Sequence, residues 1–161
     1  MKLDFKWEKF SGAIPELPRL FSLHYDEVIR GKLDIHLDFK WNRHLDLEQN
    51  GILKFMAARS QGLLVGYVFW IVCESLNFDI KEAITSLYYL DPLYRSADEH
   101  GVPYGKLLLR KSEPGLKKMG ADFVMITTPF GPATPVFDRL MKSEGYNSFE
   151  NVYSKSLQGG T

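Results

Sequence analysis

Side chains that commonly carry catalysis or bind metals show few recognisable patterns in this chain. The four histidines lack the spacing of a metal site, and no His-Glu-x-x-His motif is present. No Gly-x-Ser-x-Gly segment supports a serine hydrolase. Gly101 to Lys106 has some residues of a phosphate-binding P-loop, but it is one residue short, and Leu107 stands where Ser or Thr is required. The histidines are His24, His36, His44 and His100, and His24 falls on the apolar face of a predicted helix, where a core position is favoured over a catalytic one.

Cys73 is the only cysteine, so neither an intramolecular disulfide nor a cysteine-based zinc site is available. It ends an apolar run, and a buried, inert thiol is expected there. Twenty basic and twenty acidic residues cancel, which does not indicate a nucleic-acid partner. The N-terminus has no signal-peptide pattern and no apolar stretch reaches membrane-spanning length, so we expect a cytoplasmic protein without a membrane partner.

Hydrophobic periodicity predicts the elements of the first half of the chain. Leu3, Phe5 and Trp7 alternate with polar residues, which indicates a half-buried strand that Ser11-Gly12 ends. Apolar residues then recur at helical spacing from 15 to 31. The pattern further predicts a helix over 41–48, a hairpin of strands 52–59 and 63–74 with its turn at 60–62, and a strand over 83–90.

The second half begins with an irregular polar loop over 95–103. A helix is expected over 104–119, with a kink or break near Arg110 because Pro114-Gly115 lies inside it. A strand over 122–127, a helix over 136–143 and a last strand ending at Leu157 complete the chain. No linker or repeat interrupts this order, so we predict a single α/β domain over 1–157 and a flexible tail over 158–161.

Several segments resemble segments of the acyl-CoA-dependent N-acyltransferase (GNAT) superfamily, and they follow one another along the chain in the family's order. Leu87–Arg95 looks like the family's fourth strand and the turn after it. The other matching segments are 106–109 with 117–122 (cofactor helix and fifth strand), 137–146 with 153–157 (C-terminal helix-turn and last strand), and 23–28 with 62–67, which are similar to GNAT-like proteins of bacteriophages. The resemblance spans essentially the whole chain. It implies the GNAT fold, a mixed, mostly antiparallel sheet flanked by helices.

The resemblance also implies acetyl-CoA as a cosubstrate. Free N–H groups at a helix N-terminus suit its diphosphate, and a strand edge splayed by a bulge suits its amide-bearing pantetheine arm. In this chain the edge would be 88–91, and the diphosphate cradle would lie between Arg95 and Lys106. The implied cofactor-binding residues are Tyr88, Tyr89, Leu90, Arg95, His100, Gly101, Val102, Tyr104, Gly105 and Lys106.

The expected cradle departs from the family's Gln/Arg-x-x-Gly-x-Gly/Ala pattern. His100 stands in place of Gln or Arg, and Pro103 in place of glycine removes one N–H donor. The loop is longer than usual in the family, and its Asp98 and Glu99 would repel a diphosphate. The cations expected to compensate are Arg95, Lys106 and Arg110.

Acyl transfer to an amine needs a neutral amine, a polarised thioester carbonyl and a proton for the leaving thiolate. The resemblance implies Glu82 as the base, with a solvated strand-end carboxylate as the alternative, and the N–H near Leu90 as the carbonyl polariser. Met141 stands where the family has its proton-donating tyrosine, and it has no proton to give. Tyr88, Tyr89, Tyr94 or Tyr104 would substitute unless no acid is needed, and we single out Tyr89 and Tyr104.

Two functions follow from these expectations. The first is an N-acetyltransferase that moves an acetyl group from acetyl-CoA to a primary amine of a small molecule or protein. The second is a catalytically inactive GNAT-fold binding protein, such as a phage-borne modulator acting in the host cytoplasm, which Pro103 and Met141 favour. Acceptor specificity is expected in segments 31–46 and 129–135, where Phe39 and Trp41 either belong to the core or line a cleft. The oligomeric state is open, a homodimer included.

Overall fold

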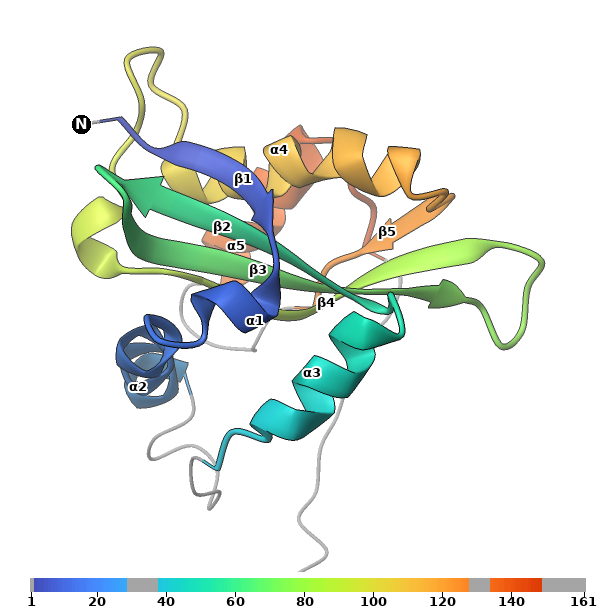
Figure 1. Ribbon diagram of the computed structural model, residues 1–161. Helices are drawn as coiled ribbons and strands as arrows, with labels where there is room; N and C mark the ends of the chain where they lie inside the picture. Colours follow the sequence, from blue (N-terminus) through green and yellow to red (C-terminus); the bar gives the residue numbers. More distant parts are fainter. Residues whose placement is uncertain (1, 29–37, 128–133, 149–161) are drawn as a thin grey trace, which may run out of the picture. The chain divides into compact units, whose positions relative to one another are not determined.

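A five-stranded sheet in the order β1-β2-β3-β4-β5 is the framework of residues 1–127 (Figure 1). The computed structural model describes residues 2–28, 38–127 and 134–148 of the 161-residue chain. Neighbouring strands are antiparallel except β4 and β5, which run parallel. The strands are β1 (Asp4–Glu8), β2 (Leu53–Ser60), β3 (Leu63–Glu74), β4 (Lys81–Leu90) and β5 (Phe123–Met125). The predicted mixed, mostly antiparallel sheet is confirmed.

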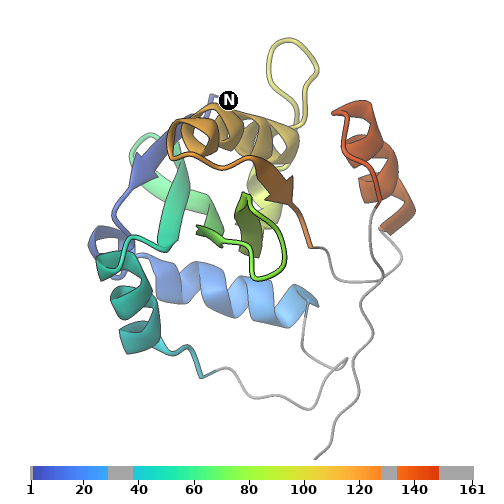
Figure 2. The ribbon, with the colours of Figure 1, turned by 90° about the vertical axis from the view of Figure 1, so that its right-hand side faces the viewer.

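Helices cover both faces of this sheet (Figure 2). On one face lie α1 (Phe10–Ala13), α2 (Leu17–Val28) and α3 (Trp41–Gln49), and on the other lies α4 (Tyr104–Lys118). A short 3-10 turn, η1 (Pro92–Tyr94), follows β4. None of the described helices has the length and apolar character needed to cross a lipid bilayer.

Aromatic side chains fill the space between the sheet and helices α1 to α3. The Phe10 ring of α1 meets Phe69 of β3 edge-on at 5.5 Å, and the Phe21 ring of α2 meets Tyr67 of β3 at 5.3 Å. Burying one such side chain contributes about 1.5–3 kcal/mol, and an edge-on aromatic pair adds about 0.5–1.5 kcal/mol. The buried cluster comprises Phe10, Ala13, Leu17, Leu20, Phe21, Leu53, Phe55, Ala57, Leu64, Tyr67, Phe69 and Tyr89.

The predicted hairpin of β2 and β3 is confirmed, including its turn. β2 ends at Ser60 and β3 begins at Leu63, which leaves Gln61 and Gly62 as a two-residue connection. Both have positive φ, 50° and 86°. Two-residue hairpins favour this left-handed geometry because it matches the twist of the strands.

The short helix α1 was not predicted, because Ser11-Gly12 had been expected only to end the first strand. Its first amides are satisfied from a distant part of the chain. The Glu48 carboxylate of α3 accepts hydrogen bonds from the Phe10 and Ser11 N–H groups, the latter at 3.1 Å. A cap supplied from a residue so far along the chain is invisible to local sequence patterns.

Helix α4 runs unbroken through Pro114, so the break expected near Arg110 is absent. Proline removes one helical hydrogen bond, but tertiary packing holds the helix here. A Cβ atom on Gly115 would lie 2.1 Å from Nε1 of Trp7 in β1, which shows that the indole packs directly on the glycine backbone. The buried side chains Leu108, Leu109 and Leu116 face the sheet from the same helix.

Helix α5 (Thr134–Ser143) belongs to a second compact unit, residues 128–161. It ends as predicted before Glu144-Gly145. Gly145 has φ 85°, and the Tyr146 N–H bonds Met141 O at 3.1 Å, a common way to close a helix. The expected last strand falls largely on 149–157, outside the described residues, and the grouping of 1–157 into one domain stays a prediction.

Candidate functional site

Strand β4 contains a β-bulge at Ser86. Trp70 of β3 pairs with Thr85, whereas the preceding Phe69 pairs with Leu87, so Ser86 has no partner on β3. A bulge adds one residue to a strand, shifts its side-chain alternation and bends it. The bulge therefore divides β4 into two segments. Because the register shifts by one residue between them, the alternation of backbone groups that face away from β3 also shifts by one residue.

Beyond Thr85 the ladder between β4 and β5 ends. The parallel pairing covers only Glu82 to Ile84 of β4. After it, the Thr127 N–H donates to Thr85 Oγ1 at 2.9 Å, and Thr127 Oγ1 donates to Thr85 O at 3.1 Å. Hydrogen bonds through the two threonine hydroxyls thus stand where a regular ladder would have backbone-to-backbone hydrogen bonds. Within the described ranges, 87–90 of β4 pairs only with β3, so the strands fork.

The backbone amide of Leu90 is directed away from β3. The Asp91 N–H donates to Val65 O of β3 at 2.9 Å, so the neighbouring Leu90–Gly66 pair is of the non-hydrogen-bonded type. The N–H and C=O of Leu90 consequently point away from β3, toward the open edge. A Cβ on Gly66 would lie 2.9 Å from Tyr89 O, so glycine allows the close approach of the two strands.

Arg95 holds the end of β4. Its Nε donates to Leu90 O at 2.8 Å, and its two Nη groups donate to the Glu27 carboxylate of α2 at 2.8 and 2.6 Å. These bonds lower the pKa of Glu27, and the carboxylate raises the pKa of Arg95. The guanidinium carbon also lies 5.4 Å from the centre of the Tyr89 ring. Arg95 is thus directed to α2, and its predicted contact with a diphosphate stays a prediction.

Tyr89 lies against a buried histidine. The His24 ring of α2 stacks on it at 4.8 Å and 17°, and His24 Nδ1 lies 2.8 Å from the Tyr67 hydroxyl. Burial lowers the pKa of His24 to about 4, so the ring is neutral at pH 7. Burial raises the pKa of Tyr89, and its neighbour Glu27 adds to the effect. Tyr89 therefore keeps its proton.

The predicted catalytic residues are not brought together. Tyr89 packs with α1 and α2, while the buried Tyr104 ring lies 6.4 Å from Phe5 on the α4 face of the sheet. Glu82 pairs with Cys73 and Phe123 inside the regular part of the sheet. It precedes Leu90 by eight residues, a separation of about 26 Å along an extended strand. A base must come within hydrogen-bonding reach of its proton, directly or through one water, and Glu82 does not reach Leu90.

The loop before α4 folds onto its own aspartate. Asp98 Oδ1 accepts from the His100 N–H at 2.9 Å and from the Val102 N–H at 2.8 Å, and the Gly101 N–H donates to Asp98 O at 3.1 Å. Gly101 has φ 77°, which this turn requires. The backbone bonds from Val102 and His100 lower the pKa of Asp98, which is therefore charged. Three of the amides predicted to hold phosphate are occupied by this turn.

The start of α4 is closed in the same way. Pro103 precedes the helix and has no N–H, and the Tyr104 N–H donates to Ser96 O at 3.0 Å. A Cβ on Gly105 would lie 2.5 Å from the Tyr88 hydroxyl, so the tyrosine covers this residue. Burial raises the pKa of Tyr88, which keeps the hydroxyl protonated. The structure thus brings Tyr88 and Gly105 together, and their role in binding a cofactor stays a prediction.

The remaining predicted cradle residues lie at its margin. Lys106 is half-buried in the first turn of α4. The His100 side chain is exposed, with its Nε2 at 3.6 Å from the Glu99 carboxylate. Among the residues with described side chains, no group of three His, Cys, Asp or Glu residues could hold a metal ion.

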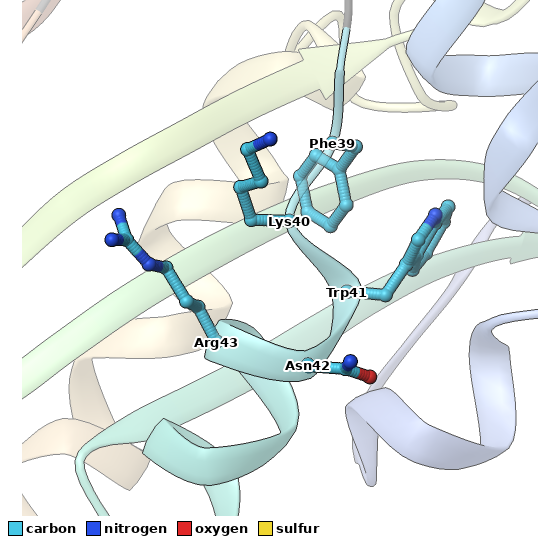
Figure 3. A pocket seen from close by; sticks show the side chains of 5 residues that line it. All are labelled: Phe39, Lys40, Trp41, Asn42 and Arg43. Carbon is cyan, nitrogen blue, oxygen red and sulfur yellow. The ribbon is translucent and has the colours of Figure 1, made fainter.

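A shallow pocket lies at the start of α3, where acceptor recognition was expected. It is lined by Phe39, Lys40, Trp41, Asn42 and Arg43 (Figure 3). The Phe39 ring stacks on Phe21 at 4.1 Å and Trp41 stacks on Phe10 at 6.1 Å, so both rings belong to the edge of the core. The charged ends of Lys40 and Arg43 extend to the same side of the pocket.

Two residues beside the fork were missed as site candidates by sequence reasoning. Glu27 was not considered, and His24 was assigned to the core, which its burial supports. They stand three positions apart on α2, a spacing that places both on one helix face. That spacing, together with Arg95 just after the end of a predicted strand, was the only sequence pattern that could have pointed to these two residues as site candidates.

Comparisons with known proteins address the fold. No protein-family model matches the sequence, and no curated protein matches it. Solved structures do match. A ribosomal-protein-alanine N-acetyltransferase from Brucella melitensis biovar Abortus 2308 is similar with a TM-score of 0.67 and 16% identity, over 98% of this chain and 100% of that one.

Two further structures show how widely the same architecture is used. A protein described as a transcriptional regulator from Bacillus halodurans C-125 has a TM-score of 0.71 and 14% identity, over 97% of this chain and 100% of that one. AAC(6')-Iy, solved with the bisubstrate analog CoA-S-monomethyl-acetylneamine, has a TM-score of 0.63 and 14% identity, over 99% and 100% of the two chains. Together with the bulged β4 and its fork from β5, these likenesses establish that the chain has the GNAT fold, the fold of the N-acetyltransferases.

Proposed function

We propose that the chain is an N-acyltransferase that moves an acetyl group from acetyl-CoA to a primary amine. The observation that carries this proposal is the fork between β4 and β5, beyond which the Leu90 N–H is directed away from β3 and has no partner strand among the described residues. An amide in a fixed position can donate to the carbonyl oxygen of a thioester as negative charge develops on it. Removing one such donor from an enzyme typically slows catalysis about 100–1,000-fold.

The chemistry needs little else from the protein. The amine nitrogen attacks the thioester carbonyl carbon, a C–N bond forms, the C–S bond breaks, and the released thiol takes up the proton that the amine loses. Tyr88 has the same place in the alternation as Leu90 and also directs its backbone away from β3. The pantetheine arm would lie along this side of β4.

The groups beside Leu90 are weak bases. Hydrogen bonds from Arg95 lower the pKa of Glu27, and burial lowers the pKa of His24 to about 4. Neither is suited to remove a proton from an ammonium group near pH 7. We therefore infer that the acceptor amine loses its proton to water, so the rate rises with pH toward the amine's own pKa, about 10.4 for a lysine side chain.

The test combines two products of one reaction. The purified chain is incubated with acetyl-CoA and a panel of small amines and peptides, and both the free thiol and the mass of the acetylated amine are measured. We expect equal amounts of the two products and a rate that increases up to about pH 9 for amines of high pKa. Thiol release at the background rate with every amine would contradict the proposal. Glu82→Gln is expected to retain activity.

A second function is favoured by one observation, the occupied amides of the loop before α4. A GNAT-fold binding protein without catalysis has no need of a phosphate cradle. A thermal titration separates the two functions, because a ligand at 100 times its Kd stabilises the folded state by about 2.7 kcal/mol. No stabilisation by acetyl-CoA would favour the binding protein.

A further inference from the structure

The segment before α4 is poorly equipped to hold a diphosphate. Such a group is best bound by several free backbone N–H groups at a helix start. Here the amides of His100, Gly101, Val102 and Tyr104 all donate within the protein. Pro103 has no N–H to offer. Gly105 is the remaining position expected to form the cradle between 100 and 105, and the Tyr88 hydroxyl covers that residue.

Three charged side chains in or beside this segment do not favour a diphosphate. Asp98 is ionised and Glu99 is exposed beside it, so two carboxylates border the helix start. Arg95 is engaged by Glu27 and by Leu90 O. An Arg–carboxylate pair is neutral overall, and its guanidinium has few donors left for a second anion. A diphosphate would therefore gain little from these three side chains, and of the cations expected to compensate only Lys106 and Arg110 of α4 are left, the second of which also acts on Asp98.

The strand edge a few residues earlier differs from this segment. The Leu90 N–H is directed away from β3, and none of the described hydrogen bonds uses it, so it can donate to a thioester carbonyl. The pantetheine arm of coenzyme A carries two amides and the thioester, and none of these lies in the nucleotide. The two ends of the cofactor thus meet very different surroundings.

We propose that this chain recognises its acyl donor through the pantetheine arm and not through the nucleotide diphosphate. The inference rests on the proposed function for its chemistry. The donor class is then any acyl-pantetheine thioester, and two sources share that chemistry, acyl-CoA and the phosphopantetheine group of an acyl carrier protein. In both cases the C–S bond to the arm breaks, the amine gains the acyl group, and the arm leaves as the thiol with the amine's proton.

Binding is measured first, because it does not depend on turnover. Calorimetry on the full chain compares CoA, pantetheine and 3′-phosphoadenosine 5′-diphosphate, which carries the diphosphate without the arm. We expect Kd values for CoA and pantetheine within about fivefold of each other and no heat from 3′-phosphoadenosine 5′-diphosphate at millimolar concentration. A CoA affinity at least about 50-fold above that of pantetheine, or competition by 3′-phosphoadenosine 5′-diphosphate, would overturn the proposal. Failure of CoA and pantetheine alike to bind would overturn it together with the proposed function.

Turnover is measured next. It shows whether acyl-CoA or an acyl carrier protein is the better donor, and it tests the acyltransferase function separately from recognition through the pantetheine arm. Acetyl-CoA, acetyl-pantetheine and an acetylated carrier protein are compared with one amine by kcat/KM. Similar values for the first two are expected, and a higher value for the carrier protein would identify it as the source. Equal binding of CoA and pantetheine without any turnover would reject the acyltransferase function while leaving the mode of recognition intact.

A pair of variants tests the physical cause. Asp98→Ala removes the acceptor and frees the amides of His100 and Val102, whereas Asp98→Asn keeps an oxygen acceptor and removes only the charge. If occupied amides exclude the diphosphate, Asp98→Ala should strengthen CoA binding over pantetheine by about tenfold and Asp98→Asn by much less. An unchanged CoA-to-pantetheine ratio in Asp98→Ala, with the fold verified by circular dichroism, would contradict this explanation.

Discussion

Arg95 and Glu27 join the end of β4 to helix α2 through two hydrogen bonds of 2.8 and 2.6 Å. The third donor of the same guanidinium binds Leu90 O at 2.8 Å. One side chain thus fixes the residue whose N–H faces the fork. Both partners are more than 40% exposed, so the pair itself contributes only about 0–1 kcal/mol to stability. Its larger effect is on the orientation of Leu90.

Arg95→Lys should therefore lower the acyl-transfer rate without much change in the free energy of unfolding. A lysine has no planar fork and cannot bind Glu27 and Leu90 O at the same time. We expect an unfolding free energy within about 1 kcal/mol of the original, but an acyl-transfer rate lower by about tenfold or more. Glu27→Gln, which leaves one acceptor for Arg95, serves as the milder control. Full activity of Arg95→Lys would show that Leu90 is held by other contacts.

Leu90→Pro tests the backbone donor itself. Proline removes the N–H that faces the fork but leaves the hydrogen bonds to β3, because the Leu90–Gly66 pair is the non-bonded type. Leu90→Ala loses the same buried side chain and keeps the N–H. We expect kcat to fall about 100-fold more in the proline variant than in the alanine variant, with both checked for folding by circular dichroism. Equal losses would exclude a role for this amide.

Most of the fold was predictable because it follows from local periodicity. The alternation of apolar and polar residues predicted β1. The turn at Gln61-Gly62, where both residues have positive φ, joins β2 to β3, and Gly145 with positive φ follows the end of α5. The failures came from long-range contacts. Glu48 caps α1 from α3, and packing of Trp7 on Gly115 carries α4 through Pro114. Neither contact leaves a trace in a window of a dozen residues.

The candidate site was predictable in its strand and less so in its side chains. The resemblance led to the part of β4 that lies beyond its pairing with β5 and includes Tyr88 and Leu90. It also led to Glu82, which lies in the regular ladder far along β4. Spacing in a sequence does not reveal where a ladder ends, because that depends on the hydroxyls of Thr85 and Thr127, which are 42 residues apart.

Gly115→Ala should destabilise the protein although it improves helix propensity. The new Cβ would lie 2.1 Å from Trp7 Nε1, so the indole or the helix must move. Overpacking of this kind costs about 1–3 kcal/mol. Gly12→Ala is the matched control, since its Cβ meets nothing within 4 Å and the helix gains up to about 1 kcal/mol. Urea unfolding of both variants should give changes of opposite sign, and a stabilised Gly115→Ala would refute the contact.

Glu48→Ala should uncap α1. The carboxylate accepts from the Phe10 and Ser11 N–H groups, and its loss leaves the Phe10 amide in a buried place without an acceptor. Removal of a capping side chain typically costs about 0.5–2 kcal/mol. Amide exchange of Phe10 and Ser11 should accelerate, while exchange in β3 follows only the global change. Replacement of the exposed Asp46 of the same helix by alanine is the control. Unchanged exchange at both α1 amides would contradict the tertiary cap.

His24 should make the protein less stable in mild acid. Its pKa is about 4 in the folded chain against an ordinary value of 6.5, so only the unfolded chain binds a proton between these pH values. Stability is then complete above about pH 6.5 and falls as the pH drops toward 4, by up to about 3 kcal/mol in all. The carboxylate of Glu27, with its lowered pKa, contributes a further loss at lower pH.

His24→Gln identifies the source of this pH dependence. The amide side chain cannot take up a proton in this range, yet it offers a hydrogen-bonding group near the Tyr67 hydroxyl that His24 contacts at 2.8 Å. Urea unfolding at pH 5 and pH 7 should therefore differ less in the variant, although its stability at pH 7 is lower because the ring no longer stacks on Tyr89. His100→Gln, at an exposed position, should behave as the original chain. A slope between pH 5 and 7 that survives unchanged in His24→Gln would mean that groups other than His24 cause the pH dependence.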